Sequence, residues 1–166
     1  MKTPSDSLTE MVQFVLPNDA NPLGFMLGGS VMHLIDIAGA VAASRHARMP
    51  LVTAAVDDLQ FLHPIRVGDL IVLRAWVNAT FTTSMEVEVE VQSEETLTGR
   101  RTLTSRAYLT FVTIGPDGQP APVPPLRLET EEERQRAEAA RQRRAERLAR
   151  RNAKEETGNE KGATAR

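Results

Sequence analysis

One acidic side chain, Asp36, stands inside an apolar run that extends from about residue 29 to residue 47. A carboxylate removed from water is costly unless it is paired, protonated or used in a reaction. A structural acid would need a partner, which His33, three residues earlier, could supply. A metal ligand would need companions, but His33, His46 and His63 lack metal-site spacing. A catalytic carboxylate would explain both the cost and the position.

Two adjacent glycines, Gly28 and Gly29, come at the start of this run and mark the beginning of a predicted helix. The first N–H groups of a helix have no partner within it, and the helix dipole is positive at the same end. Such a place can hold an anion or polarise a carbonyl oxygen. At a rise of roughly 1.5 Å per residue, Asp36 lies about two turns further along. The stretch therefore predicts a carboxylate close to a site for a carbonyl group.

Other common catalytic arrangements are missing from the sequence. There is no cysteine, which excludes thiolate chemistry and disulfides and suits a reducing, cytoplasmic compartment. Gly-x-Ser-x-Gly elbows, Walker A loops and dinucleotide fingerprints are also absent. We therefore expect no cofactor and no metal. The apolar stretch at 31–43 is too short, and too interrupted by polar residues, to span a membrane.

The elements that must position these residues are one helix and five strands. The helix, roughly 29–47, is apolar on nearly every side and so should be enclosed by protein, either by a sheet that wraps it or by a second subunit. Residues 84–92, SMEVEVEVQ, alternate between apolar residues and glutamates, which predicts a strand with a buried face and a solvated glutamate face. The other predicted strands are 10–17, 53–62, 70–79 and 103–114.

The charge distribution separates a body from a tail. The chain of 166 residues has a net charge of −2, but acidic side chains outnumber basic ones in residues 1–126 and the reverse holds in residues 127–166. We interpret 1–126 as one domain whose acidic balance argues against nucleic-acid binding. Residues 127–166 predict a solvated, partly helical extension, disordered from Thr157 onward. A weak RNA- or membrane-binding appendage is the alternative.

Taken in order, four segments resemble the hotdog-fold acyl-CoA thioesterases, the acyl-CoA hydrolase family. They are 17–47, 52–71, 83–89 and 111–124, and together they cover nearly all of residues 10–124. The resemblance implies an α+β fold in which an antiparallel sheet wraps one long central helix. It also implies that a second copy completes a continuous sheet in a homodimer, and that such dimers assemble into a hexamer, a trimer of dimers.

For activity, the resemblance implies hydrolysis of an acyl-CoA substrate. Asp36 would act as general base or nucleophile, and Asn21 would orient the water or bind the reacting centre from the other subunit. The Gly29 N–H would stabilise the oxyanion. The same resemblance makes Gly28, Thr53 and Ser84 candidates for substrate binding, the last of them near the CoA moiety. It also matches Asp57, and for both Thr53 and Asp57 a folded-core or turn role is equally compatible.

Two features leave alternatives open. Leu27 stands where the family often has an aromatic residue or histidine, and Leu34-Ile35 precedes the acid without a bulky aromatic, so the sequence does not define the preferred acyl chain. A non-catalytic acyl-CoA-binding module is the main alternative function. Such a sensor should be fused to a DNA-binding segment, which this sequence does not contain. A hydratase is disfavoured because the residues do not follow its Asp/His pattern.

Overall fold

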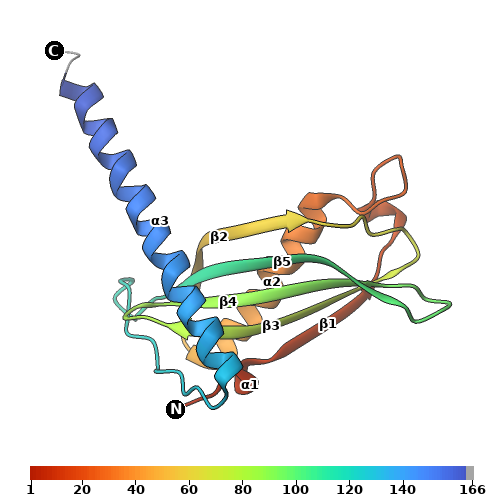
Figure 1. Ribbon diagram of the computed structural model, residues 1–166, viewed down its shortest axis with the longest axis horizontal. Coiled ribbons are helices and arrows are strands. Elements are labelled where there is room, and N and C mark those ends of the chain that lie inside the picture. The colour runs from red at the N-terminus through yellow and green to blue at the C-terminus, as the bar shows by residue number, and fades with distance from the viewer. Residues whose placement is uncertain (164–166) are drawn as a thin grey trace.

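The computed structural model describes residues 1–163, with side chains described as far as Thr157. Five strands form one antiparallel sheet in the order β1-β3-β4-β5-β2, so β1 and β2 are its edges. The long helix α2 lies on one face of this sheet and the C-terminal helix α3 crosses the other, which we call the outer face (Figure 1). In chain order the elements are α1 (Pro4–Ser7), β1 (Thr9–Phe14), the 3-10 turn η1 (Pro17–Asp19), α2 (Gly28–Ala47), β2 (Leu51–Phe61), β3 (Leu70–Thr80), β4 (Ser84–Glu94), β5 (Arg101–Thr113) and α3 (Glu131–Ala163).

The predicted α+β architecture is confirmed, because the five strands and the long helix all form close to their expected positions. Alternation places the valines of β4 on the inner face, where they are fully buried against α2. Gly39 lies where α2 packs tightly against the sheet. A Cβ added there would lie 3.1 Å from the ring of Phe111, itself fully buried. A small residue is therefore required where α2 crosses β5.

The opposite side of α2 is not covered within one chain. Met32 is 45% exposed and Ile37 is 36% exposed, and both lie on the side away from the sheet. The edge strand β2 is also largely exposed, with Val52 at 51% and Val56 at 44%. The helix was expected to be enclosed by the sheet or by a second subunit. Within one chain the sheet covers only one side of it. The apolar residues that remain exposed form a surface suited to a second subunit.

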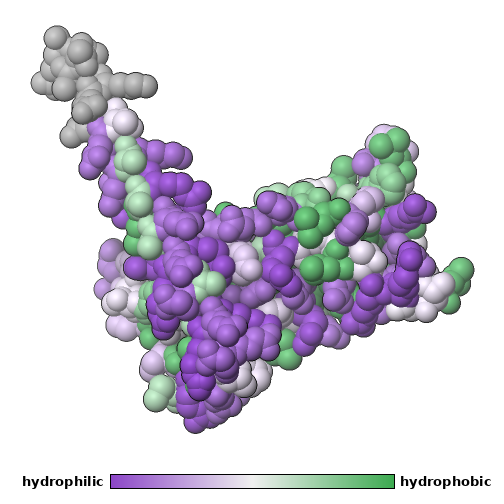
Figure 2. All heavy atoms as spheres, viewed as in Figure 1, coloured by the Kyte–Doolittle hydropathy of each residue, from purple (hydrophilic) through white to green (hydrophobic). Residues whose placement is uncertain are grey.

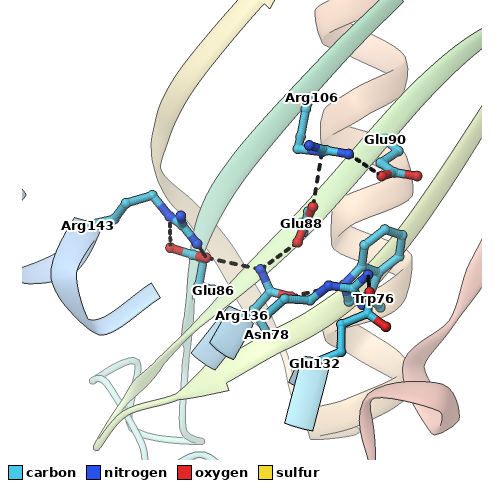
Figure 3. A network of polar contacts seen from close by, with 9 residues as sticks. All are labelled: Trp76, Asn78, Glu86, Glu88, Glu90, Arg106, Glu132, Arg136 and Arg143. Atoms are coloured by element: carbon cyan, nitrogen blue, oxygen red, sulfur yellow. Dashed lines mark hydrogen bonds and ion pairs between the residues drawn. The ribbon is translucent and has the colours of Figure 1, made fainter. Parts of the chain in front are cut away.

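The prediction made for the glutamates of β4 was wrong. Their face was expected to be solvated, but Glu86 is 1% exposed and Glu88 is 5% exposed. Arg143 of α3 reaches Glu86 through two hydrogen bonds, Nε to Oε2 at 3.0 Å and Nη2 to Oε1 at 2.7 Å. The glutamate face of the strand is therefore an interface with α3 (Figure 3).

A hydrogen-bonded network continues across the outer face (Figure 3). The Nδ2 of Asn78 donates to Glu88 at 2.9 Å and lies 3.3 Å from Glu86. Arg106 joins Glu88 at 3.2 Å from the other side. Burial raises the pKa of Glu88, and the hydrogen bond from Asn78 opposes that rise. Each buried carboxylate thus has both a cationic and a neutral partner, which a buried charge requires.

The C-terminal segment also differs from its prediction. Ala137 and Ala140 are buried against the sheet, at 1% and 0% exposure, and Arg136 stacks on Trp76 with 4.8 Å to the ring centroid. The first half of α3 is therefore packed rather than solvated. Beyond Arg151 the helix projects from the body, and the residues drawn in colour there are mainly hydrophilic (Figure 2).

The helix α3 is also longer than expected. It continues to Ala163, although disorder was predicted from Thr157; the last part of that prediction, residues 164–166, lies outside the described residues. Among the residues that are described, no helix combines the length and apolar character needed to cross a membrane.

Candidate active site

Asp36 lies on the exposed side of α2, in its third turn, and is half-buried in the single chain. Its Oδ1 accepts a hydrogen bond of 2.7 Å from the hydroxyl of Thr53 on the edge strand β2. The apolar residues around Asp36 in the sequence suggested that it would be enclosed, but it is only half-buried. One of its oxygens is held by the sheet, and the carboxylate lies on the surface that includes Met32 and Ile37.

The partner expected for a structural acid is not the one observed. His33 is exposed, and no hydrogen bond joins it to Asp36 in the described part of the chain. Within residues 1–163, no group of three or more His, Cys, Asp or Glu side chains is arranged to hold a metal ion. The contact to Thr53 was not foreseen: the two roles expected for that residue were substrate binding and a position in the folded core or a turn.

Asn21 lies in the loop between η1 and α2. Its Oδ1 accepts hydrogen bonds from the backbone N–H groups of Leu23 at 3.0 Å and Phe25 at 3.1 Å. These two donors define which side-chain atom is the oxygen, and they leave the Nδ2 group as a donor without a protein partner among the described residues. The loop thus holds the amide in a fixed orientation through its own backbone.

The helix start occupies the predicted position. Leu27 is the N-cap residue and provides no side-chain cap, so the N–H groups of Gly28 and Gly29 have no partner in the helix. A Cβ added at Gly29 would meet no atom within 4 Å, whereas one at Gly28 would lie 3.4 Å from Phe61. The backbone at Gly29 is therefore accessible to a ligand.

Asn21 and Gly28 share a cavity of about 390 Å³ between the loop, the start of α2 and the end of β2. Most of its other walls are apolar, including Phe25, Val31 and Phe61. Asp36 does not line this cavity. One chain therefore contains two separate parts of the predicted site: the amide beside the helix start, and the carboxylate held by β2.

The remaining predicted residues lie on the outer side of the sheet. Ser84 begins β4 and lines a second cleft, beneath α3. Asp57 forms an ion pair with Arg147 of α3 at 2.7 Å. Of the two roles expected for Asp57, this contact supports the structural one. The arginines of α3 had been interpreted as solvated. Their repeat at intervals of three and four residues beside Ala137 and Ala140 was the available sign of a packed helix face.

A family model described as the thioesterase superfamily matches residues 23–100. An uncharacterized acyl-CoA thioester hydrolase of Bacillus subtilis is 42% identical over 119 residues, which are 72% of this chain and 69% of that protein. The chain belongs to the thioesterase superfamily. A cytosolic acyl coenzyme A thioester hydrolase of Rattus norvegicus is 36% identical over 138 residues, which are 82% of this chain but 36% of that longer protein.

Solved structures place the chain among the hotdog-fold acyl-CoA hydrolases. An acyl-CoA hydrolase from Bacillus cereus superposes with a TM-score of 0.88 at 33% identity, covering 95% of this chain and 96% of that one. An acyl-CoA hydrolase from Staphylococcus aureus gives a TM-score of 0.86 at 35% identity, covering 94% and 95%. The predicted fold and the predicted enzyme class, a thioesterase, are therefore confirmed.

Proposed function

We propose that this thioesterase hydrolyses acyl-CoA thioesters, with Asp36 as the carboxylate that attacks or activates water for attack. The observation that carries the proposal is the 2.7 Å hydrogen bond by which Thr53 holds one carboxylate oxygen. This bond orients the acid on an exposed apolar surface and leaves its second oxygen available. A positioned carboxylate of this kind is the group that general-base or nucleophilic catalysis needs.

The spacing of three residues replaced in a relative supports the choice of Asn21, Asp36 and Thr53 as site residues. Variants of the Staphylococcus aureus acyl-CoA hydrolase have been solved with one asparagine, one aspartate and one threonine each replaced by alanine. Those positions are separated by 15 and 17 residues. Asn21, Asp36 and Thr53 have the same separations in this chain. The same acyl-CoA hydrolase was also solved in complex with butyryl coenzyme A.

The site is completed by a second copy of the chain in a homodimer. Asn21 and Asp36 do not share a cavity within one chain, and the side of α2 that presents Asp36 carries exposed apolar residues. Pairing of two copies through α2 and the β2 edge would cover these residues and bring the amide of one chain to the acid of the other. Hexameric structures of related thioesterases support assembly of such dimers into a trimer of dimers.

In the reaction, the thioester carbonyl lies against the N–H of Gly29 and the Nδ2 of Asn21. These donors stabilise the negative charge that develops on the carbonyl oxygen. As a general base, Asp36 accepts a proton from the attacking water. The new C–O bond forms, the C–S bond breaks, and the proton passes to the CoA thiolate. The apolar cavity beside Gly28 receives the acyl chain.

Thiol release from a panel of substrates, from acetyl-CoA to palmitoyl-CoA, tests the proposal. We expect turnover of at least one substrate, and loss of at least a thousandfold in Asp36→Asn, because acid–base catalysis and positioning together supply about that factor. Asp117→Asn is the matched control, since it removes the same charge from an exposed turn. Label recovered in the Asp36 carboxylate after a single turnover in ¹⁸O-water would identify it as a nucleophile, because a general base leaves the water oxygen only in the product acid.

Undiminished turnover in Asp36→Asn would overturn the site assignment. Binding of acyl-CoA without turnover of any substrate would instead identify a non-catalytic binding module.

A further inference from the structure

The edge strand β2 contacts a helix on each of its two faces. On the inner face, the hydroxyl of Thr53 donates to Asp36 of α2 at 2.7 Å. On the outer face, the carboxylate of Asp57 accepts a hydrogen bond of 2.7 Å from Nη1 of Arg147 in α3. Residues four apart in a regular strand point to the same face. The opposite directions of Thr53 and Asp57 therefore require an irregularity between them.

A β-bulge at Ala54 supplies this irregularity. Thr53 pairs with Phe111 of β5 and Ala55 pairs with Thr110, so two steps along β2 match one step along β5. An extra residue of this kind reverses the side-chain direction of the residues that follow it.

The pairing partners on β5 confirm the reversal, because directly opposed residues of an antiparallel pair point to the same face. Thr53 lies opposite Phe111, which belongs to the core beneath α2. Asp57 lies opposite Tyr108, on whose ring Arg143 of α3 stacks at 3.6 Å from the centroid. The bulge therefore allows one short stretch of β2 to be held from both sides.

A second bulge follows on the same strand. From Asp57 to Gln60, three steps along β2 match two along β5, and Asp58 has a φ of 53°, in the left-handed region. The two bulges interrupt the ladder to β5 on either side of residues 55–57. Because β2 is an edge strand, this segment has backbone partners on one side only within the chain. Its position therefore relies more on side-chain contacts than that of a central strand.

The ion pair between Asp57 and Arg147 is suited to fix this segment. The Asp57 side chain is 10% exposed and that of Arg147 is 22% exposed, so solvent and salt screen the pair less than they screen a surface pair. Arg147 lies one helical turn after Arg143, whose two hydrogen bonds to Glu86 hold α3 on the sheet. The pair thus connects β2 to a helix that is itself held in place.

We propose that Asp57 and Arg147 are positioning residues for the reaction: their ion pair fixes the segment between the two bulges and so keeps the hydroxyl of Thr53 directed at Asp36. This inference rests on the proposed function, in which Asp36 is the reacting acid. A displacement of Asp57 is transmitted along β2 to Thr53, four residues earlier in the same strand. Small displacements matter, because a misplacement of about 1 Å can cost up to about a hundredfold in rate.

A kinetic double-mutant cycle tests this role. Asp57→Asn weakens the ion pair, and Asp58→Asn is the matched control, because it removes the same charge from the next residue, which is exposed. With the best substrate of the acyl-CoA panel, we expect Asp57→Asn to lower kcat about fivefold with KM unchanged, and the control to retain native kinetics. In the Thr53→Val background, Asp57→Asn should lower kcat by less than about twofold further, because the hydroxyl that it positions is gone. Size-exclusion chromatography confirms that each variant keeps the native assembly.

Hydrogen–deuterium exchange measures the positioning without reference to turnover. The backbone amides of residues 53–57 should exchange at least about fivefold faster in Asp57→Asn and in Arg147→Met than in the native protein, because either change weakens the hold on β2. The same amides should exchange at the native rate in Asp58→Asn. Circular dichroism confirms that each variant is folded.

Several outcomes would overturn the positioning role. They are losses of kcat from Asp57→Asn and Thr53→Val that multiply in full, a raised KM with native kcat in Asp57→Asn, equal effects in Asp58→Asn, and native exchange of residues 53–57 in both variants that break the pair. If the native protein turns over no substrate of the panel, the proposed hydrolysis fails separately. Faster exchange of residues 53–57 in that inactive protein would still support the hold of the ion pair on β2.

Discussion

The hydroxyl of Thr53 donates a hydrogen bond of 2.7 Å to Oδ1 of Asp36, and so joins the exposed edge strand β2 to the middle of α2. The two residues are 17 positions apart in the chain. This contact gives the carboxylate a defined orientation, although it lies on a surface that a single chain leaves uncovered.

Removing that hydroxyl should slow the reaction without unfolding the protein. We expect Thr53→Val to lower kcat about tenfold or more, because one hydrogen bond to a charged group contributes roughly 1.5–3 kcal/mol. Thr53→Ser keeps the hydroxyl and should retain most of the activity. Steady-state kinetics with the best substrate of the acyl-CoA panel measure both. Native kcat in Thr53→Val would contradict a role for this hydrogen bond in the reaction, because valine keeps the methyl group and removes only the hydroxyl.

The ion pair between Glu86 and Arg143 should be costly to break from one side. Arg143→Met leaves Glu86, which is 1% exposed, without its cation. Breaking a buried pair in this way typically costs about 3–5 kcal/mol. We expect Glu86→Gln in the same chain to recover more than half of that loss, since it removes the unpaired charge and keeps the amide shape. Urea unfolding of the native protein, both single variants and the double variant measures the coupling.

A loss below about 1 kcal/mol in Arg143→Met would contradict this account, because that is the range of an exposed pair.

Deleting α3 should destabilise the domain, which differs from what the sequence suggested for a solvated tail. Truncation after Leu128 would expose Trp76, Glu86 and Glu88, all of them buried on the outer face. We expect a clear fall in the unfolding temperature, and with it a loss of turnover at temperatures where the native protein is active. Truncation after Asn152 removes only the projecting part and is the control. Equal unfolding temperatures for the two truncations would refute the packing role of α3.

Stability should fall in mild acid because of His46. This side chain is 1% exposed, and its Nε2–H donates to the carbonyl of Pro124 at 2.7 Å. Burial lowers the pKa of His46 below its ordinary value of 6.5. The unfolded chain therefore binds a proton at a higher pH than the folded one. The contribution of neutral His46 to stability is present above pH 6.5 and is lost as the pH falls below it.

Urea unfolding at several pH values between 5 and 8 measures this dependence. His46→Gln retains a donor for Pro124 but does not titrate, so the variant should lose less stability between pH 7 and pH 5 than the native protein. An identical slope in both proteins would assign the acid sensitivity to other groups.

Much of the fold followed from local patterns in the sequence. Alternation at period two marked β4, and the glycine pair marked the start of α2, because side-chain direction in a strand and unpaired N–H groups in a helix depend on neighbouring residues alone. Asp36 was noticeable for the same reason, since a single acid in an apolar run needs no tertiary information to be seen. The resemblance to a family then supplied Asn21.

The tertiary structure alone decided which surfaces are buried and which side chains meet. Glu86 and Glu88 look like a solvated face until α3 packs over them, and Arg143, which makes that contact, lies 57 residues after Glu86. Thr53 and Asp36 likewise meet only when β2 lies beside α2. Periodicity reports that a strand has two different faces, but the burial of each face depends on elements far away in the chain. The local sequence therefore determined the elements and the acid, whereas packing at a distance determined the partners of each charge.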